Sequence, residues 1–87
     1  MKTALITGAS RGIGNAIALE FLEKGYSVIG TATTEAGAAE LTKIGINGRV
    51  LDLNNVDSID QFWQKLEEDG EIVSLLINNA GITRDNI

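Results

Sequence analysis

The chain has 87 residues, enough for one small domain or for part of a larger one. It contains no cysteine and no histidine, which excludes disulfide bonds, thiolate and imidazole metal sites, and a Ser-His-Asp catalytic triad. The net charge is −5 and acids and bases are interspersed, so we expect neither nucleic acid nor a membrane as a partner. There is no signal-peptide hydrophobic region and no apolar run long enough to span a bilayer, so we expect a cytoplasmic protein.

Short apolar segments alternate with helical patterns along the chain. The glycines at 25, 45 and 70 come where each helical pattern stops and predict the helix ends. The predicted elements are, in chain order, a strand at Ala4–Thr7, a helix at Ile13–Lys24, a strand at Ser27–Thr31, a helix at Glu35–Ile44, a strand at Arg49–Leu53, a helix between Asn55 and Gly70, and a strand at Ile72–Ile77.

Apolar residues at helical spacing predict which helix faces form the core. Asn55 is the expected N-cap of the third helix. The first helix has its predicted apolar face at Ile13, Ala16, Ile17 and Phe21, and the third at Val56, Ile59, Phe62, Trp63 and Leu66.

The order strand-helix-strand-helix-strand-helix-strand predicts an α/β fold, a parallel sheet with helices on both faces. Right-handed crossovers, with the third returning past the first strand, give the strand order 3-2-1-4. This is the N-terminal half of a doubly wound Rossmann fold, in which ligands bind at the carboxyl ends of strands one and four. The loops after Thr7 and after Ile77 both lie at that position.

The first of these loops is rich in glycine and reads T-G-A-S-R-G-I-G from Thr7 to Gly14. Gly8 permits a sharp turn, Gly12 leaves room for a phosphate beside the backbone, and Gly14 permits close helix–strand packing. The N–H groups at the helix start then face the phosphate. The alternative is that the glycines serve only a tight strand–helix turn.

Two related motifs do not fit this loop. A P-loop requires lysine and then serine or threonine after its last glycine, but Asn15 and Ala16 stand there. The G-x-G-x-x-G fingerprint would put glycine or alanine at position 17, which is Ile17. The remaining pattern, T-G-x-x-x-G-x-G, resembles that of the short-chain dehydrogenases.

The second loop, Asn78-Asn79-Ala80-Gly81, resembles the N-N-A-G signature of the same family. Asn79 can bridge backbone groups of two strands, and the small Ala80 and Gly81 leave room for a ribose. The longer match N-N-A-G-I-T-R-D-N, at residues 78–86, is similar to bacterial 3-oxoacyl-[acyl-carrier-protein] reductases. So is Gly30-Thr31-Ala32-Thr33, although acetoacetyl-CoA reductases share much of both.

The region after the second strand favours NADP(H) over NAD(H). NAD enzymes usually place an acid there for the ribose 2′-hydroxyl, whereas the first acid here is Glu35, at the start of the next helix. Arg11 and Thr33 are the expected partners of a 2′-phosphate. Arg11 has the alternative reading of a solvated loop arginine.

The resemblance also implies roles for other residues at the cofactor. Asp52 corresponds to the family position that contacts the adenine amino group, and Leu53 would flank the ring. The alternative for Asp52 is a polar strand end near the cap Asn55. The expected cofactor-binding residues are Gly8, Ala9, Ser10, Arg11, Gly12, Ile13, Gly14, Thr33, Asp52, Leu53, Asn79, Ala80 and Gly81.

The family's catalytic serine, Tyr-x-x-x-Lys pair and asparagine have no counterpart in the sequence. Tyr26 has Gly30, not lysine, four residues on. We therefore expect residues 1–87 to be the NADP-binding half of a Rossmann domain, without the catalytic half. The resemblance implies a homotetrameric parent that reduces 3-oxoacyl-[acyl-carrier-protein] thioesters with NADPH in fatty-acid synthesis. The alternatives are another NADP-dependent short-chain reductase, such as an acetoacetyl-CoA reductase, and a non-enzymatic nucleotide-binding fragment.

Overall fold

The computed structural model describes residues 2–80 and has the seven elements in the predicted order. The elements are β1 (Thr3–Ile6), α1 (Gly12–Glu23), β2 (Ser27–Ala32), α2 (Glu35–Lys43), β3 (Asn47–Val50), α3 (Val56–Glu68) and β4 (Leu75–Ile77). Within residues 2–80, no helix combines the length and the apolar character that a membrane span requires.

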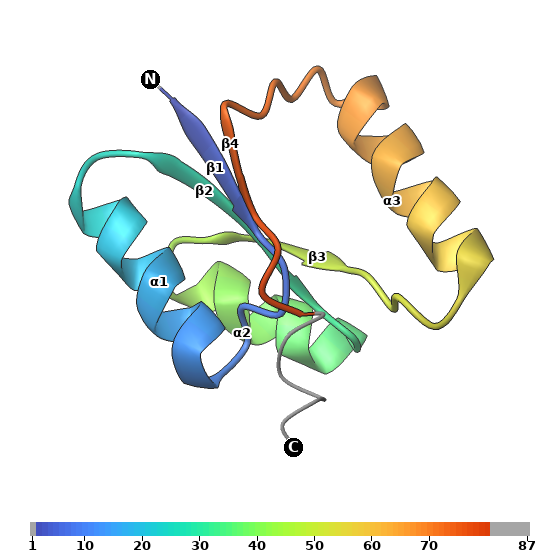
Figure 1. Ribbon diagram of the computed structural model, residues 1–87, viewed down its shortest axis with the longest axis horizontal. Coiled ribbons are helices and arrows are strands. Elements are labelled where there is room, and N and C mark those ends of the chain that lie inside the picture. The colour runs from blue at the N-terminus through green and yellow to red at the C-terminus, as the bar shows by residue number, and fades with distance from the viewer. Residues whose placement is uncertain (1, 81–87) are drawn as a thin grey trace.

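The four strands form one parallel sheet in the order β3-β2-β1-β4, which confirms the predicted topology. Figure 1 shows α1 and α2 on one side of this sheet and α3 on the other. Because all strands run in the same direction, the segments that follow β1 and β4 leave the sheet at the same edge. The N-terminal half of a Rossmann fold has this arrangement.

A separate apolar cluster covers each face of the sheet. Ala4 and Ile6 of β1 pack with Val28 of β2 and with Ala18 and Leu41 of the helices α1 and α2. Leu5, the residue between them, points to the opposite face and packs with Ile29, Leu51, Phe62 and Leu66. The alternation of side chains along each strand therefore buries every residue of β1 and every residue of β2 after Ser27, as expected for a parallel sheet.

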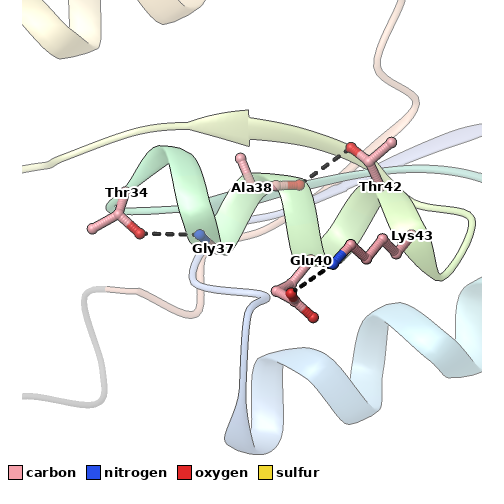
Figure 2. Close-up of polar contacts among 6 residues, drawn as sticks. All are labelled: Thr34, Gly37, Ala38, Glu40, Thr42 and Lys43. Carbon is pink, nitrogen blue, oxygen red and sulfur yellow. Dashed lines mark hydrogen bonds and ion pairs between the residues drawn. The ribbon is translucent and has the colours of Figure 1, made fainter.

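The helix boundaries follow the predicted stop and start signals. Gly25, Gly45 and Gly70 have φ values of 93°, 94° and 74°, and each comes just after a helix, in the left-handed region that glycine adopts without strain. The Asn55 side chain accepts hydrogen bonds from the N–H groups of Asp57 and Ser58, so the predicted cap of α3 is confirmed. Thr34 caps α2 in the same way by accepting from Gly37 N–H, a contact drawn in Figure 2.

Four residues predicted to face the core are exposed instead. In α1 these are Ile13, with 71% of its surface accessible, and Ala16. Ile13 is in the first turn of α1 and is not part of the apolar cluster between this helix and the sheet. In α3 they are Val56 and Trp63, which is 48% accessible. The apolar stripe of α3 is wider than its contact with the sheet, which Ile59, Phe62 and Leu66 make.

All four strands differ from their predicted bounds, β1 and β2 by one residue and β3 and β4 by more. β3 was expected at Arg49–Leu53 but pairs with β2 over Asn47–Val50. Leu51 N–H still donates to Ala32, and the chain then turns at Asp52. β4 was expected at Ile72–Ile77 but pairs with β1 only from Leu75. The length of β4 depends on its pairing partner, and β1 pairs with it through the three residues Ala4–Ile6.

Candidate functional site: the dinucleotide cleft

The loops after β1 and after β4 are hydrogen bonded to each other at the carboxyl edge of the sheet. Thr7 N–H donates to the carbonyl oxygen of Ile77 at 3.1 Å. The Thr7 hydroxyl accepts from Ala80 N–H at 3.0 Å and donates to Asn78 Oδ1 at 3.2 Å. The two sequence motifs therefore form one connected structure, as their places in the topology predicted.

Asn79 makes the bridge that the sequence suggested. Its side-chain Nδ2 donates to the carbonyl oxygen of Gly8 at 3.1 Å, and only 5% of the residue is accessible. Gly14 packs against the same two groups: a Cβ placed there would overlap the Gly8 carbonyl oxygen and lie 2.5 Å from Asn79 Nδ2. The close contact of helix and loop thus requires glycine at position 14.

The backbone of the glycine-rich loop suits an anion. Gly8 and Gly12 both have φ of 65°, and no atom lies within 4 Å of a Cβ built on Gly12. Arg11 precedes α1 but makes no side-chain cap hydrogen bond. Since the first N–H groups of a helix have no acceptor inside it, they are available together with the positive end of the helix dipole. A phosphate group fits these donors.

A cleft of about 350 Å³ lies against this loop and brings together most of the predicted cofactor residues. Arg11 and Thr33, predicted to hold a 2′-phosphate, line the same cleft, and both are exposed. No described residue that lines it has a carboxylate. The lining residues are Gly8, Ser10, Arg11, Gly12, Ile13, Thr31, Ala32, Thr33, Leu51, Asn79 and Ala80.

The remaining predicted residues lie elsewhere. Ala9 and Gly14 are buried behind the cleft, where they shape the loop without lining it. Asp52 and Leu53 also do not line it. The Asp52 carboxylate accepts from Asn54 N–H at 3.0 Å, which is the turn role weighed as its alternative. Gly81 lies outside the described residues.

Three lining residues were missed by sequence reasoning as site residues. Thr31 and Ala32 are the last residues of β2, and Leu51 follows β3. Their position at the carboxyl ends of strands next to the predicted switch point was the available signal. The third strand ends at Val50, three residues before its predicted end at Leu53, and Leu51 then lines the cleft.

The described residues contain no catalytic or metal constellation. Tyr26 packs edge-to-face on Phe21, with ring centroids 4.8 Å apart, and belongs to the apolar cluster beneath α1. No group of three or more acidic, histidine or cysteine side chains within residues 2–80 could hold a metal ion.

Comparison with known proteins agrees with this geometry. The sequence pattern of the family described as short chain dehydrogenase matches residues 2–87. The 3-oxoacyl-[acyl-carrier-protein] reductases FabG of Vibrio harveyi and Escherichia coli are each 51% identical to the chain over 89 residues. That of Haemophilus influenzae is 48% identical.

These alignments include 99% of the chain but 36–37% of each reductase, so the chain spans about a third of the length of the curated relatives it matches. The match covers the two loops and all seven elements described above. The chain belongs to the short-chain dehydrogenase family.

Proposed function

We propose that the cleft binds NADP(H) and serves the reduction of a 3-oxoacyl-[acyl-carrier-protein] to its 3-hydroxyacyl product. The observation that carries the cofactor assignment is the charge of the cleft. Arg11 lines it without any carboxylate among the described lining residues, although the chain as a whole has a net charge of −5. An acid at the end of β2 would repel a 2′-phosphate, and Thr33 stands there instead.

Each part of the dinucleotide has proposed partners. The loop of residues 8–14 would bind the pyrophosphate through the backbone N–H groups at the start of α1. Arg11 and Thr33 would bind the 2′-phosphate by charge-assisted and neutral hydrogen bonds. Residues 79–81 would line the ribose. Asp52 and Leu53 are proposed to flank the adenine, next to Leu51, which lines the cleft.

The reaction is proposed from the relatives, whose printed name is 3-oxoacyl-[acyl-carrier-protein] reductase. NADPH, when bound, supplies the hydride that reduces a carbonyl carbon. The residues described here would orient the cofactor at the edge of the sheet. The acyl-carrier-protein thioester, a homotetramer and a cytoplasmic location belong to the same proposal, because the family resemblance implies them.

Calorimetric titration of the chain with NADPH and with NADH tests the cofactor assignment. We expect NADPH to bind more tightly, and Arg11→Ala to weaken NADPH binding by about ten- to a hundredfold, the effect of one or two charge-assisted hydrogen bonds. NADH binding should stay within about twofold, since it has no 2′-phosphate.

Arg49→Ala is the matched control for this titration. Arg49 is ion-paired with Asp69 at 2.7 Å and does not line the cleft, so its loss should leave both affinities unchanged. Equal affinity for the two cofactors, or an equal loss of both in Arg11→Ala, would contradict the 2′-phosphate assignment.

The reductase assignment can be tested in a chimera. Residues 1–87 would replace the aligned third of the Escherichia coli reductase, which is 51% identical over this segment. We expect the chimera to oxidise NADPH in the presence of a 3-oxoacyl thioester. A folded chimera that binds NADPH and reduces no 3-oxoacyl thioester would contradict the reaction proposed here.

A further inference from the structure

Two side chains outside the family glycines fix the main chain of the phosphate loop around Ala9. Thr31, near the end of β2, accepts a hydrogen bond from Gly8 N–H on its hydroxyl oxygen at 3.0 Å. Its main-chain carbonyl accepts from Ala9 N–H at 2.8 Å. Asn15, in α1, donates its side-chain Nδ2 to the carbonyl oxygen of Ala9 at 3.0 Å.

The packing around these bonds leaves the loop little freedom. Thr31 is 1% accessible and Ala9 is fully buried. A Cβ on Gly30 would lie 2.9 Å from the Ala9 Cβ, so the loop rests directly on β2 at this point. Thr31 therefore acts on a ligand mainly through the loop, because almost none of its own surface is available for contact.

The same bonds decide which loop groups face the cleft. Gly8 N–H and Ala9 N–H are donated to Thr31 and cannot also serve a phosphate. The Ala9 carbonyl, whose oxygen would repel a phosphate, is bonded to Asn15. The donors left for an anion are those that follow, in the first turn of α1, next to the cleft residues Ser10 and Gly12.

We propose that Thr31 and Asn15 are positioning residues of the dinucleotide site. They hold the Gly8–Ala9 backbone so that the next N–H groups are presented to the pyrophosphate before the ligand arrives. This inference rests on the proposed function. Loss of a positioning residue should weaken NADPH and NADH binding equally, because both cofactors contain the pyrophosphate. Loss of a 2′-phosphate contact should weaken NADPH binding alone.

The test is calorimetric titration of Thr31→Val, Thr31→Ser and Asn15→Ala with both cofactors. Thr31→Val keeps the shape but leaves Gly8 N–H without its acceptor, and should weaken NADPH and NADH binding by the same factor, about tenfold. Thr31→Ser keeps the hydroxyl and should restore binding to within about twofold. Asn15→Ala should also weaken both cofactors equally, leaving their ratio unchanged.

Matched changes elsewhere control for a general loss of stability. Thr42→Val removes a hydroxyl that donates to Ala38 within α2, away from the cleft (Figure 2). Asn47→Ala removes an amide that accepts from Arg49. Both controls should bind as the unchanged chain does.

The outcomes separate the two proposals. If the unchanged chain binds NADPH and folded Thr31→Val binds it equally well, the inference is overturned. It is also overturned if Thr31→Ser binds as weakly as Thr31→Val, or if the NADPH/NADH ratio changes. If Thr31→Val does not fold, Asn15→Ala takes its place: an unchanged affinity for NADPH, or a changed NADPH/NADH ratio, then overturns the inference. A folded, unchanged chain that binds neither cofactor overturns the proposed function, and the inference with it.

Discussion

The side-chain amide of Asn79 donates to the main-chain carbonyl of Gly8 at 3.1 Å and so joins two loops that are 71 residues apart in the sequence. Gly14 packs against the same carbonyl. The end of β4, the phosphate loop and the start of α1 therefore meet at one buried point. The geometry of the cleft depends on this point, and several measurable effects follow from it.

Replacing Asn79 with alanine should destabilise the chain. The change leaves a partly buried acceptor, the Gly8 carbonyl, without its donor, which costs about 1–3 kcal/mol of the free energy of unfolding. Asn54→Ala is the control, because the Asn54 side chain is exposed and its loss should cost less than about 0.5 kcal/mol. Urea unfolding measures both. Equal stability of Asn79→Ala and the unchanged chain would show that the bridge does not support the loop.

Gly14→Ala should destabilise the chain more than an alanine substitution at a glycine that has open space around it. Its Cβ would overlap the Gly8 carbonyl oxygen, so the helix and loop must separate, at a cost of about 1–3 kcal/mol and a weaker cofactor affinity. Gly25→Ala is the comparison: Gly25 has φ of 93° and open space, so its cost of about 1 kcal/mol is conformational and cofactor binding should not change. Unaltered binding by Gly14→Ala would argue against the tight contact.

The two helix caps should contribute separately to stability. Thr34→Ala and Asn55→Ala each remove an acceptor for the first-turn N–H groups of a helix, and each should lower the free energy of unfolding by about 1 kcal/mol. Thr42→Ala, within α2, should change it by less than about 0.5 kcal/mol, because the Thr42 hydroxyl only adds a bond to a carbonyl already inside the helix (Figure 2). Thermal unfolding of the three variants measures these changes. A loss of stability in Thr42→Ala as large as that in the two cap variants would contradict the prediction.

The free edge of β4 should make the chain of residues 1–87 self-associate. Within residues 2–80, β4 is paired with β1 on one side only, and its Leu75 and Leu76 are 36% and 52% accessible. Exposed apolar strand edges pair with other chains, and a charge on the edge prevents this. We expect sedimentation to show concentration-dependent dimers or larger species, reduced in Leu76→Lys. Glu67→Lys, a charge change on exposed α3, should have no such effect. A monomer at every concentration would refute the expectation.

Much of the architecture could be predicted because it follows from local patterns. Gly25, Gly45 and Gly70 end their helices, and Asn55 begins one, through contacts within a few residues of the chain. Once the element types were known, the handedness of parallel crossovers left few topologies, and the order β3-β2-β1-β4 was one of them. The site then had to lie where the loops after β1 and β4 meet.

The errors concern quantities that depend on distant parts of the chain. Ile13 and Trp63 are apolar and correctly spaced, yet both are exposed, because burial depends on whether a neighbouring element covers that part of the helix. The third strand ends at Val50 and not at Leu53, because the pairing of β3 with β2, and the turn at Asp52, set where that strand ends.

The element order, the sheet topology and the two loops of the site could all be predicted from the amino-acid sequence, since each depends on short-range patterns and on the handedness of crossovers. The contacts by which Thr31 and Asn15 fix the Ala9 backbone, and the place of Leu51 at the cleft, became visible in the three-dimensional structure alone. Such contacts join residues from different elements. Their geometry results from packing the helices on the sheet, which no local pattern specifies.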